Sequence, residues 1–322
     1  MKQLFLGLLI LQVSLAMAQD QQLTLASNIW PPFTNVSEER KIALDLVEMA
    51  LNRAGYEVDY QILEFEEVIE GIRAKRFHGS AALWKDSSRM EYLNYSIPYL
   101  HNQLILVGRK GSQVNITLDK LGNQKLGVVR NYSYGDELKV SKTQISYADD
   151  AQELLDKLLQ NEVDYILIDA LLVEYLSRYQ KQEVAQYLEI APKPAFYRSL
   201  YFTLRKDFPN SNQIIEYFNE EIKKMVKDGS YNKVLEVKWI ESDIDGNGWA
   251  ELVSYSGQGG VLKPVSSYRV PLESDNKETD TELKKYYING TLYDSWDKVP
   301  DKYKSQNQKE EEQDFTILEF RF

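Results

Sequence analysis

Residues 79–100 read GSAALWKDSSRMEYLNYSIPYL, and this stretch decides how the chain folds. The apolar segment 81–83 is typical of a short buried strand, and a polar turn follows it. The turn leads to Arg89, whose guanidinium can hold a carboxylate through two parallel hydrogen bonds. The stretch therefore predicts a strand and a turn that position Arg89 to bind an anion. Alternatively, Arg89 is a surface residue paired with Asp86 or Glu91.

Length and composition narrow the class of protein. The chain has 322 residues, which is too long for one ordinary hydrophobic core and predicts two or three domains. Its formal net charge is -11, so a nucleic acid or an anionic membrane would be repelled, and we expect neither as a partner. The two histidines, His78 and His101, match no zinc-site spacing and argue against a Ser-His-Asp triad.

The first 18 residues have the pattern of a cleaved secretory signal. They read MKQLFLGLLILQVSLAMA, with one lysine, an apolar run and small residues before Gln19. The run is short for a bilayer span, which favours cleavage after Ala18 over a membrane anchor. The chain has no cysteine, as suits an exported protein in an oxidising compartment. We therefore expect a soluble periplasmic protein.

Strand and helix patterns alternate along the N-terminal part of the chain. Strand patterns at 23–27, 58–63 and 81–83 are separated by helix patterns at 37–54 and 64–74. This order predicts an α/β fold with a parallel sheet, whose ligands lie at the carboxyl ends of the strands. Trp30, Phe65, Trp84 and Arg89 all follow such ends, so we expect them to converge on one edge. As alternatives, Trp30 plugs the core and Phe65 is an N-terminal staple.

The order strand, turn, Arg, then Y-x-x-Y-S-x-P-Y at 92–99 resembles the type II periplasmic solute-binding proteins, in particular the amino-acid-binding family 3. The resemblance covers about residues 21–239. It implies the two-lobed periplasmic binding protein type II fold, with a ligand cleft between the lobes. Lobe 1 would comprise residues 19–107 and 200–240, and lobe 2 residues 108–199. We expect the first crossing between lobes at 107–112 and the second near Ser199.

The resemblance also implies the roles of individual residues. Arg89 falls where the family holds a ligand α-carboxylate, and Trp30 and Phe65 where it places aromatics on the ligand. Asp169, which follows the buried strand pattern 163–168, falls where the family receives an α-ammonium. Together Arg89 and Asp169 would bind a zwitterion as the lobes close. The alternative for Asp169 is a cap for a helix at 170–178.

A second loop, after the strand pattern 125–129, is the counterpart of a carboxylate-binding loop in the family. Arg130, Tyr132, Ser133 and Tyr134 stand in this loop, whose backbone N–H groups can also hold an anion. Asn131 and Tyr132 replace small residues of the family pattern, as Trp84 does on the other side of the cleft, and we expect a reshaped pocket. Alternatively, the loop is solvated and Arg130 is exposed.

The composition changes after Trp239, and residues 241–322 predict a small β-rich extension of unknown role. Its segment 243–251 places oxygen-bearing side chains at alternate positions around glycines, which resembles the calcium loops of FG-GAP repeats. The expected Ca²⁺ ligands are the side chains of Asp243, Asp245, Asn247 and Glu251 and the carbonyl of Trp249. Alternatively, the segment is a linker turn. Asn289-Gly290 predicts a tight hairpin further on.

These features predict a periplasmic receptor that captures an amino acid or a similar zwitterion for an ABC importer or a membrane sensor. No chemistry on the ligand is expected. One alternative is an enzyme on the same fold, resembling cyclohexadienyl dehydratases, with Glu64, Glu66 or Asp86 as the acid. The other is a scaffold whose cleft has lost its ligand, which Trp84, Asn131 and Tyr132 suggest.

Overall fold

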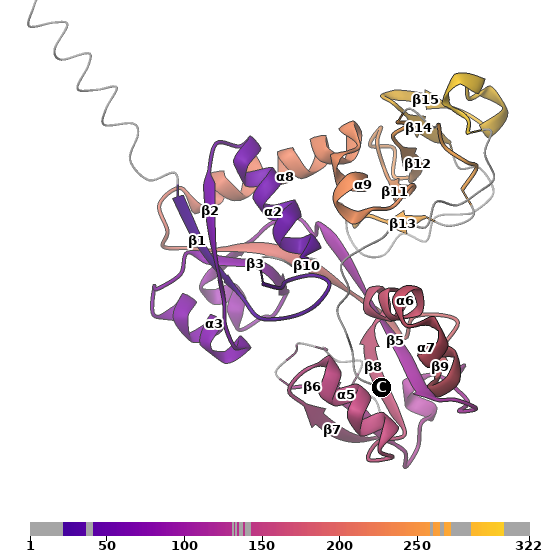
Figure 1. Cartoon of the computed structure of the whole chain (residues 1–322). Coiled ribbons are helices and arrows are strands. Elements are labelled where there is room, and N and C mark those ends of the chain that lie inside the picture. The colour runs from indigo at the N-terminus through magenta and orange to yellow at the C-terminus, as the bar shows by residue number, and fades with distance from the viewer. Residues whose placement is uncertain are drawn as a thin grey trace, which may run out of the picture.

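Strands and helices alternate in the structure much as the sequence predicts. The computed structural model describes residues 22–36, 41–130, 132, 134, 138, 143–257, 260–264, 267–271 and 285–305. Figure 1 shows two α/β lobes joined by long strands, and a smaller unit of C-terminal strands beside the first lobe. The expected signal peptide, residues 1–18, lies outside the described residues, as does any strand near the C-terminus. None of the described helices is long and apolar enough to cross a membrane.

One mixed sheet runs through both lobes in the order β2-β1-β3-β10-β5-β8-β6-β7. Its strands are β1 Gln22–Ser27, β2 Glu57–Ile62, β3 Gly79–Trp84, β5 Leu100–Arg109, β6 Lys125–Val129, β7 Gln144–Ala148, β8 Tyr165–Asp169 and β10 Phe196–Arg205, with β4 Leu93–Tyr95 paired to β10 and β9 Leu188–Ile190 paired to β5. Within lobe 1, β1 pairs in parallel with β2 and β3, and within lobe 2, β6 pairs in parallel with β7 and β8. The predicted parallel sheet is confirmed within each lobe.

Helices cover both faces of the sheet. They are α2 Ile42–Arg53, α3 Phe65–Arg73, α5 Ala151–Leu159, α6 Ala170–Tyr179, α7 Lys181–Tyr187, α8 Ser211–Asp228 and α9 Ser230–Leu235. In β1, Leu25 packs in the core with α2, whereas the next residue, Ala26, packs in a separate cluster with Val68 of α3. Because successive side chains of a strand point to opposite faces, α2 and α3 sit on opposite sides of the sheet.

Two long strands carry the chain from one lobe to the other. The first half of β5, up to Leu104, pairs with β10, and from Leu104 to Gly108 it pairs with β8 of lobe 2. The second half of β10, from Leu200, pairs with β3 of lobe 1. The transition thus lies within β5 near Leu104, earlier than the expected 107–112. β5 is one continuous strand of one sheet, so the sequence pattern does not mark the point of transition.

The C-terminal unit is a separate five-stranded sheet with the order β13-β11-β12-β14-β15. Its strands are β11 Ile240–Ser242, β12 Glu251–Ser254, β13 Tyr268–Arg269, β14 Tyr286–Ile288 and β15 Thr291–Tyr293. The predicted hairpin is confirmed, because Asn289 and Gly290 join β14 to β15 with φ values of 49° and 82°. Both values are positive, as a type I′ turn requires. A small core around Trp239 and Tyr286 holds the unit together.

The C-terminal unit is fixed to the crossing strand β5. The hydroxyl of Tyr268, on β13, accepts a hydrogen bond from the backbone N–H of His101 at 2.7 Å and donates one to its carbonyl at 2.9 Å. Beside it, the Tyr231 hydroxyl of α9 donates to the carbonyl of Tyr99 at 2.7 Å. A tyrosine side chain therefore satisfies two backbone groups as a neighbouring strand would.

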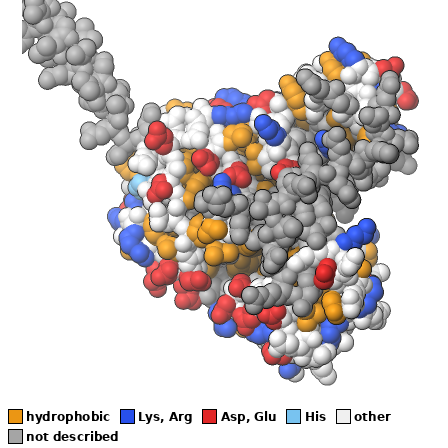
Figure 2. Space-filling model, in the orientation of Figure 1, with side chains coloured by type: hydrophobic (Ala, Val, Ile, Leu, Met, Phe, Trp, Pro, Cys, Tyr) orange, Lys and Arg blue, Asp and Glu red, His pale blue; other side chains and the backbone are white. Residues whose placement is uncertain are grey.

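Charged side chains of both signs are mixed over the face of the molecule shown in Figure 2. Several ion pairs join charged side chains at the surface of the molecule, including one between Arg53 and Asp228 at 2.7 Å. Exposed pairs of this kind contribute little to stability individually.

Candidate functional site

The loop after β1 places Trp30 at the seam between the lobes. Within this loop the backbone N–H of Trp30 donates to the carbonyl of Thr34 at 2.8 Å, and the N–H of Thr34 donates back at 3.0 Å. The Thr34 hydroxyl also donates to the carbonyl of Asn28 at 2.6 Å. Phe33 is fully buried and packs on the Trp30 ring at a centroid distance of 4.8 Å. The loop therefore holds the indole in a fixed position.

Arg89 is delivered to the same seam by a short 3-10 helix, Arg89–Glu91, that follows β3. Its side chain is buried, with 9% of the residue exposed. The guanidinium donates to the carbonyl of Trp84 at 3.4 Å, and its Cζ lies 5.2 Å from the ring centroid of Phe65. A cation over an aromatic face is attracted by the ring quadrupole. Phe65 thus covers the cation that is expected to hold a ligand carboxylate.

Asp86 takes hydrogen bonds from its own turn. Its carboxylate accepts from the backbone N–H and the hydroxyl of Ser88, at 3.0 and 2.6 Å. Partial burial acts to raise the pKa of Asp86, but the Ser88 hydroxyl and the charge of Arg89 outweigh it, so the pKa lies below its usual value. The charge of Arg89 therefore already acts on a neighbouring carboxylate.

Asp169 ends β8 in lobe 2 and faces lobe 1. Only 5% of the residue is exposed, and its Oδ2 accepts a hydrogen bond from the indole N–H of Trp30 at 2.8 Å. Asp169 stands at the N-cap position of α6, yet its side chain makes no capping hydrogen bond to that helix. The other carboxylate oxygen, Oδ1, is buried and has no hydrogen-bond partner among the described residues. Helix capping therefore does not explain this buried carboxylate.

The buried surroundings of Asp169 disfavour the ionised form of its carboxyl group. Burial raises the pKa of its carboxyl group to about 6, while the Trp30 N–H and the side chain of Asn102 lower it. Burial outweighs both of these effects because a charged carboxylate loses most of its hydration there. The carboxylate is still mainly ionised at neutral pH, so it can attract a cationic group.

Aromatic rings connect the two lobes at this point. Tyr132, from lobe 2, lies 5.2 Å from both Trp30 and Trp84 of lobe 1 and 6.2 Å from Phe65, measured between ring centroids. Tyr134, on the same loop, lies 5.5 Å from Trp84. Edge-to-face pairs at such distances are favourable beyond the area they bury. The lobes are therefore in direct contact.

The described residues leave a small cavity at this contact. It has a volume of about 20 Å³ and is lined by Asn28, Trp30, Phe65, Ala82, Leu83, Trp84, Arg89 and Tyr132. A volume of this size accommodates about one water molecule and no amino acid. The described conformation is closed, with the protein's own rings in the cleft. A larger open hollow of about 460 Å³ lies on lobe 2 beside Arg109 and Lys120, and none of the predicted site residues lines it.

Not every predicted residue lies in the cleft. Arg130 is exposed and pairs with Asp149 at 3.2 Å, which matches the alternative of a solvated loop with an exposed arginine. The hydroxyl of Tyr134 accepts from the backbone N–H of Val129 at 2.9 Å, so it has a structural partner. Ser133 lies outside the described residues, as does Asn131.

Two asparagines were missed by the sequence analysis. Asn28 lines the small cavity, and Asn102 of β5 lies close enough to Asp169 to lower the pKa of its carboxyl group. Asn102 lies among three consecutive polar residues, 101–103, and the sequence pattern does not single it out. For Asn28 the signal was its place directly after a strand end.

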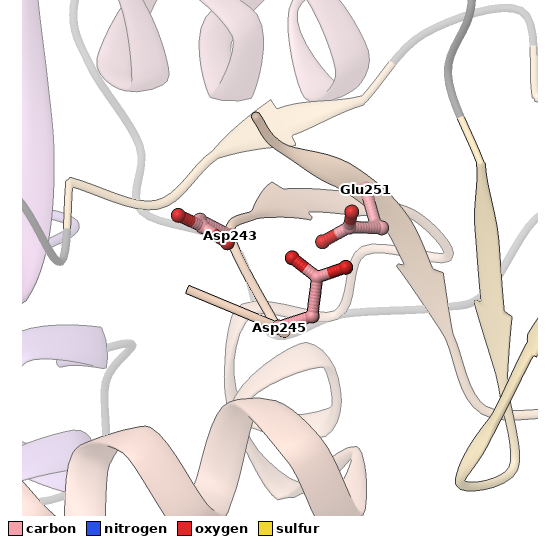
Figure 3. Close-up of side chains that lie close together, drawn as sticks. All are labelled: Asp243, Asp245 and Glu251. Carbon is pink, nitrogen blue, oxygen red and sulfur yellow. The ribbon is translucent and has the colours of Figure 1, made fainter. Parts of the chain in front are cut away.

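The C-terminal unit contains a cluster of three carboxylates. Asp243, Asp245 and Glu251 each place an oxygen within 4.8 Å of the others, and Figure 3 shows them around one loop. Burial, opposed by a hydrogen bond from the Ile244 backbone, raises the pKa of Glu251, and the charges of Asp245 and Asp243 raise it further. Like charges held together in this way repel, and a cation among them would relieve the repulsion.

The remaining predicted calcium ligands lie on the same loop. Asp243 accepts from the backbone N–H groups of Gly246 and Gly248, both at 2.7 Å, and the side chain of Asn247 accepts from Trp249 at 2.8 Å. Trp249 itself is 58% exposed. The loop is therefore ordered by its own backbone, and its carboxylates are held near one point.

Comparison with known proteins gives a family. A family model described as bacterial extracellular solute-binding proteins, family 3, matches residues 23–242. The L-cystine-binding protein TcyA of Bacillus subtilis (strain 168) is 22% identical over 202 residues, which are 62% of this chain and 72% of TcyA. The virulence sensor protein BvgS of Bordetella pertussis is 23% identical over 176 residues, which are 51% of this chain and 14% of BvgS.

Solved structures share the fold of the two lobes. The ligand-binding core of GluR0 from Nostoc punctiforme, in complex with L-glutamate, has a TM-score of 0.56 at 18% identity and covers 66% of this chain and 97% of that one. The periplasmic VFT2 domain of BvgS has the same TM-score at 17% identity and covers 69% and 95%. The expected two-lobed fold is therefore confirmed. The family model matches well over half of the length of this chain, and the chain therefore belongs to the bacterial extracellular solute-binding proteins, family 3.

Proposed function

We propose that this solute-binding protein captures an amino acid or a closely related zwitterion between its lobes and performs no chemistry on it. One observation carries the proposal: a buried arginine and a buried carboxylate, Arg89 and Asp169, lie at the two sides of the same seam. A zwitterion offers the opposite charge to each. TcyA is named for binding L-cystine, and the GluR0 core was solved with L-glutamate, which supports ligands of this class.

Binding requires the lobes to separate, because the closed cleft has a free volume of only about 20 Å³. The indole N–H of Trp30 now donates to Asp169, and the Phe65 ring covers Arg89. A ligand would replace the first contact with its ammonium and the second with its carboxylate. Both exchanges trade a weaker partner for a charged one, and charge-assisted hydrogen bonds are the stronger kind.

The experiment is a thermal-shift screen of residues 19–322 against the amino acids, their desamino analogues and small organic acids. We expect at least one amino acid to raise the melting temperature, because a ligand that binds only the folded state stabilises it. Desamino analogues should give smaller shifts. If no compound stabilises the protein, the proposal fails and a scaffold with a self-filled cleft becomes the better account.

A turnover assay separates the receptor from the enzyme. Prephenate and arogenate are incubated with the purified protein and followed for loss of substrate. Binding without turnover is the expected result. Among the acids that sequence analysis offered for catalysis, Glu64, Glu66 and Asp86, the last has little support as a proton donor, since the pKa of Asp86 lies below its usual value. Measurable turnover would contradict the receptor proposal.

We also propose the cellular setting. An exported chain cleaved after Ala18 would work in the periplasm, delivering its ligand to an ABC permease or reporting it to a membrane sensor. The relative BvgS is named a sensor, which supports the second of these, although the match covers 14% of that protein. Sequencing the N-terminus of the exported protein tests the cleavage site, and Gln19 is the expected first residue.

As a second function we propose that Asp243, Asp245, Asn247, Trp249 and Glu251 hold Ca²⁺ in an FG-GAP-like loop. The observation that favours it is the convergence of three carboxylates, one of them buried, on a single point. Oxygen ligands are the ones that Ca²⁺ prefers. Bound calcium would stabilise the loop and the strands β11 and β12 on either side of it.

Terbium, which binds calcium sites, tests this proposal, because the exposed Trp249 can transfer excitation energy to an ion in its own loop. We expect terbium luminescence that calcium competes away, and a melting temperature that EDTA lowers. Asp245→Ala should abolish both effects, whereas Asp294→Ala, an exposed acid of the same unit that pairs with Lys298, should leave them intact. An unchanged melting curve in EDTA would contradict the calcium site.

A further inference from the structure

Asn102 carries a buried amide next to the cleft. It lies in the crossing strand β5, is 0% exposed, and neither its Oδ1 nor its Nδ2 has a hydrogen-bond partner in the described part of the chain. Buried amides are almost always hydrogen-bonded in folded proteins. An amide with both ends unsatisfied therefore calls for an explanation that packing alone does not give.

The strand register places this amide beside Asp169. Leu104 of β5 lies directly opposite Asp169 of β8, and Asn102 is two residues from Leu104 on the same face. Diagonal neighbours across two antiparallel strands are within reach of one another. The side chain of Asn102 lowers the pKa of the Asp169 carboxyl group, which agrees with this proximity.

The unsatisfied atoms of the two residues complement each other. Asp169 Oδ1 is a buried acceptor without a partner among the described residues, and Asn102 offers one acceptor and one donor group. A rotation about χ2 exchanges the NH₂ group and the carbonyl oxygen of the Asn102 amide. The NH₂ group can therefore face the Asp169 carboxylate when no ligand is bound. The carbonyl oxygen can face a hydrogen-bond donor of the ligand when one is bound. Once the hydrogen bond from the Trp30 indole to Asp169 is broken, the subsite has three acceptors. These are the two carboxylate oxygens of Asp169 and Oδ1 of Asn102.

Three acceptors match the three N–H bonds of a primary ammonium. On the basis of the function proposed above, we propose that Asn102 and Asp169 form one polar subsite that binds the primary ammonium of the ligand. Asn102 is then a specificity-determining residue, because an N,N-dimethylated ammonium has a single N–H and leaves two of the acceptors unsatisfied.

The first arm of the test needs no ligand. The indole N–H resonance of Trp30 reports the ionisation of Asp169, to which it donates, and is assigned by its loss in Trp30→Phe. It is followed by NMR between acid and mildly alkaline pH. Among the described residues, Tyr132 and Tyr134 are the ionisable groups whose pKa the charge of Asp169 raises, and burial raises the pKa of both far above this range. The observed midpoint therefore belongs to Asp169.

We expect Asn102→Leu, which keeps the size and removes the amide, to move this midpoint to higher pH. The matched control is Asn94→Leu on β4, whose amide bonds Ser211 away from the cleft, and it should titrate as the wild type does. If Asn102→Leu does not fold, Asn102→Asp replaces it, and repulsion between two carboxylates should also raise the midpoint. An unchanged midpoint in the folded variant overturns the subsite.

The second arm measures recognition by calorimetry. The probes are L-glutamate, L-glutamine, L-arginine and L-cystine, each compared with its N,N-dimethyl derivative. We expect the wild type to prefer the primary amine, and Asn102→Leu to lose about 10- to 100-fold in affinity for it and much of that preference. Equal affinities for wild type and Asn102→Leu overturn the inference. If no probe binds the wild type, the proposed function fails, and the NMR titration still decides whether the two residues form one subsite.

Discussion

The indole nitrogen of Trp30 donates a 2.8 Å hydrogen bond to Asp169 across the cleft, from a loop of lobe 1 to the end of a strand in lobe 2. Both residues are buried. The protein thereby supplies its own donor to the carboxylate that is proposed to receive the ligand's ammonium. A ligand whose ammonium binds Asp169 has to displace this contact, so the strength of the contact sets part of the ligand affinity.

Trp30→Phe removes the donor and keeps an aromatic ring. We expect the unliganded variant to be less stable by about 1–3 kcal/mol, because a hydrogen bond to a buried carboxylate is lost. Ligand affinity should rise, since the competing contact is gone. Denaturant unfolding and calorimetry measure the two effects. Trp84→Phe is the control. The indole nitrogen of Trp84 is buried without a partner among the described residues, so its removal should lower the stability by less than Trp30→Phe does. Weaker binding by Trp30→Phe would mean that the indole contacts the ligand directly.

Arg89→Ala should lower ligand affinity by about 2–5 kcal/mol, because the ligand carboxylate would be buried without its charged partner. Arg89→Lys keeps the charge but not the paired hydrogen bonds, so we expect an intermediate loss. Calorimetric titration measures both. Arg130→Ala is the control, since its side chain is exposed and pairs with Asp149. Equal affinity of Arg89→Ala and the wild type would remove this arginine from the site.

The pH dependence of stability should carry the signature of Asp169. Its pKa is about 6 in the folded protein and 3.8 for an ordinary aspartate, so between these values the folded state binds more protons than the unfolded state. Stability therefore falls as pH rises through this window, by about 3 kcal/mol for the fully shifted group. Asp169→Asn should lose this contribution, which is read from the difference between variant and wild-type unfolding curves. A difference that does not vary with pH would contradict the raised pKa.

Ligand binding should depend on pH in the opposite direction. Only the ionised carboxylate of Asp169 attracts an ammonium, so affinity should rise as pH increases through about 6. Calorimetry at several pH values measures this in the wild type, and Asp169→Asn should bind weakly at all of them. Constant affinity across the window would remove Asp169 from the proposed ammonium site.

Tyr268→Phe should destabilise the protein by about 1–3 kcal/mol, because the N–H and the carbonyl of His101 both lose the partner that the hydroxyl provides. The loss should appear in the unfolding of the lobes as well as of the C-terminal unit, since the contact joins the two. Tyr255→Phe is the control, because Tyr255 belongs to the same unit and is exposed. A Tyr268→Phe variant as stable as the wild type would show that the unit is held by other contacts.

The fold and much of the site follow from local sequence patterns. Trp84 is the last residue of β3, and Trp30, Phe65 and Arg89 lie on the segments that follow β1, β2 and β3. Because the carboxyl ends of parallel strands meet at one edge, their convergence was predictable. Asp169 stood out because a carboxylate at the end of an apolar strand needs a partner.

Contacts between lobes were not predictable in this way. The bond from Trp30 to Asp169 joins residues 139 positions apart, and its formation depends on how far the lobes close. Arg130 turns to solvent because Asp149 lies at the end of the neighbouring strand, which depends on strand register. The N-cap of α5 is Asp150, whose side chain accepts from the backbone N–H of Glu153. Its neighbour Asp149 looks the same in sequence, so the local pattern does not decide which of the two caps the helix.

We propose above that the cleft recognises a zwitterion through Arg89 and Asp169. A calorimetric comparison of three ligands tests it most directly: the amino acid that stabilises the protein best, its α-carboxamide, and its desamino analogue. We predict that the carboxamide and the desamino analogue each bind about 10-fold or more weaker than the amino acid, and that Arg89→Ala and Asp169→Asn respectively remove these differences. Equal binding of all three ligands by the wild type would contradict the account.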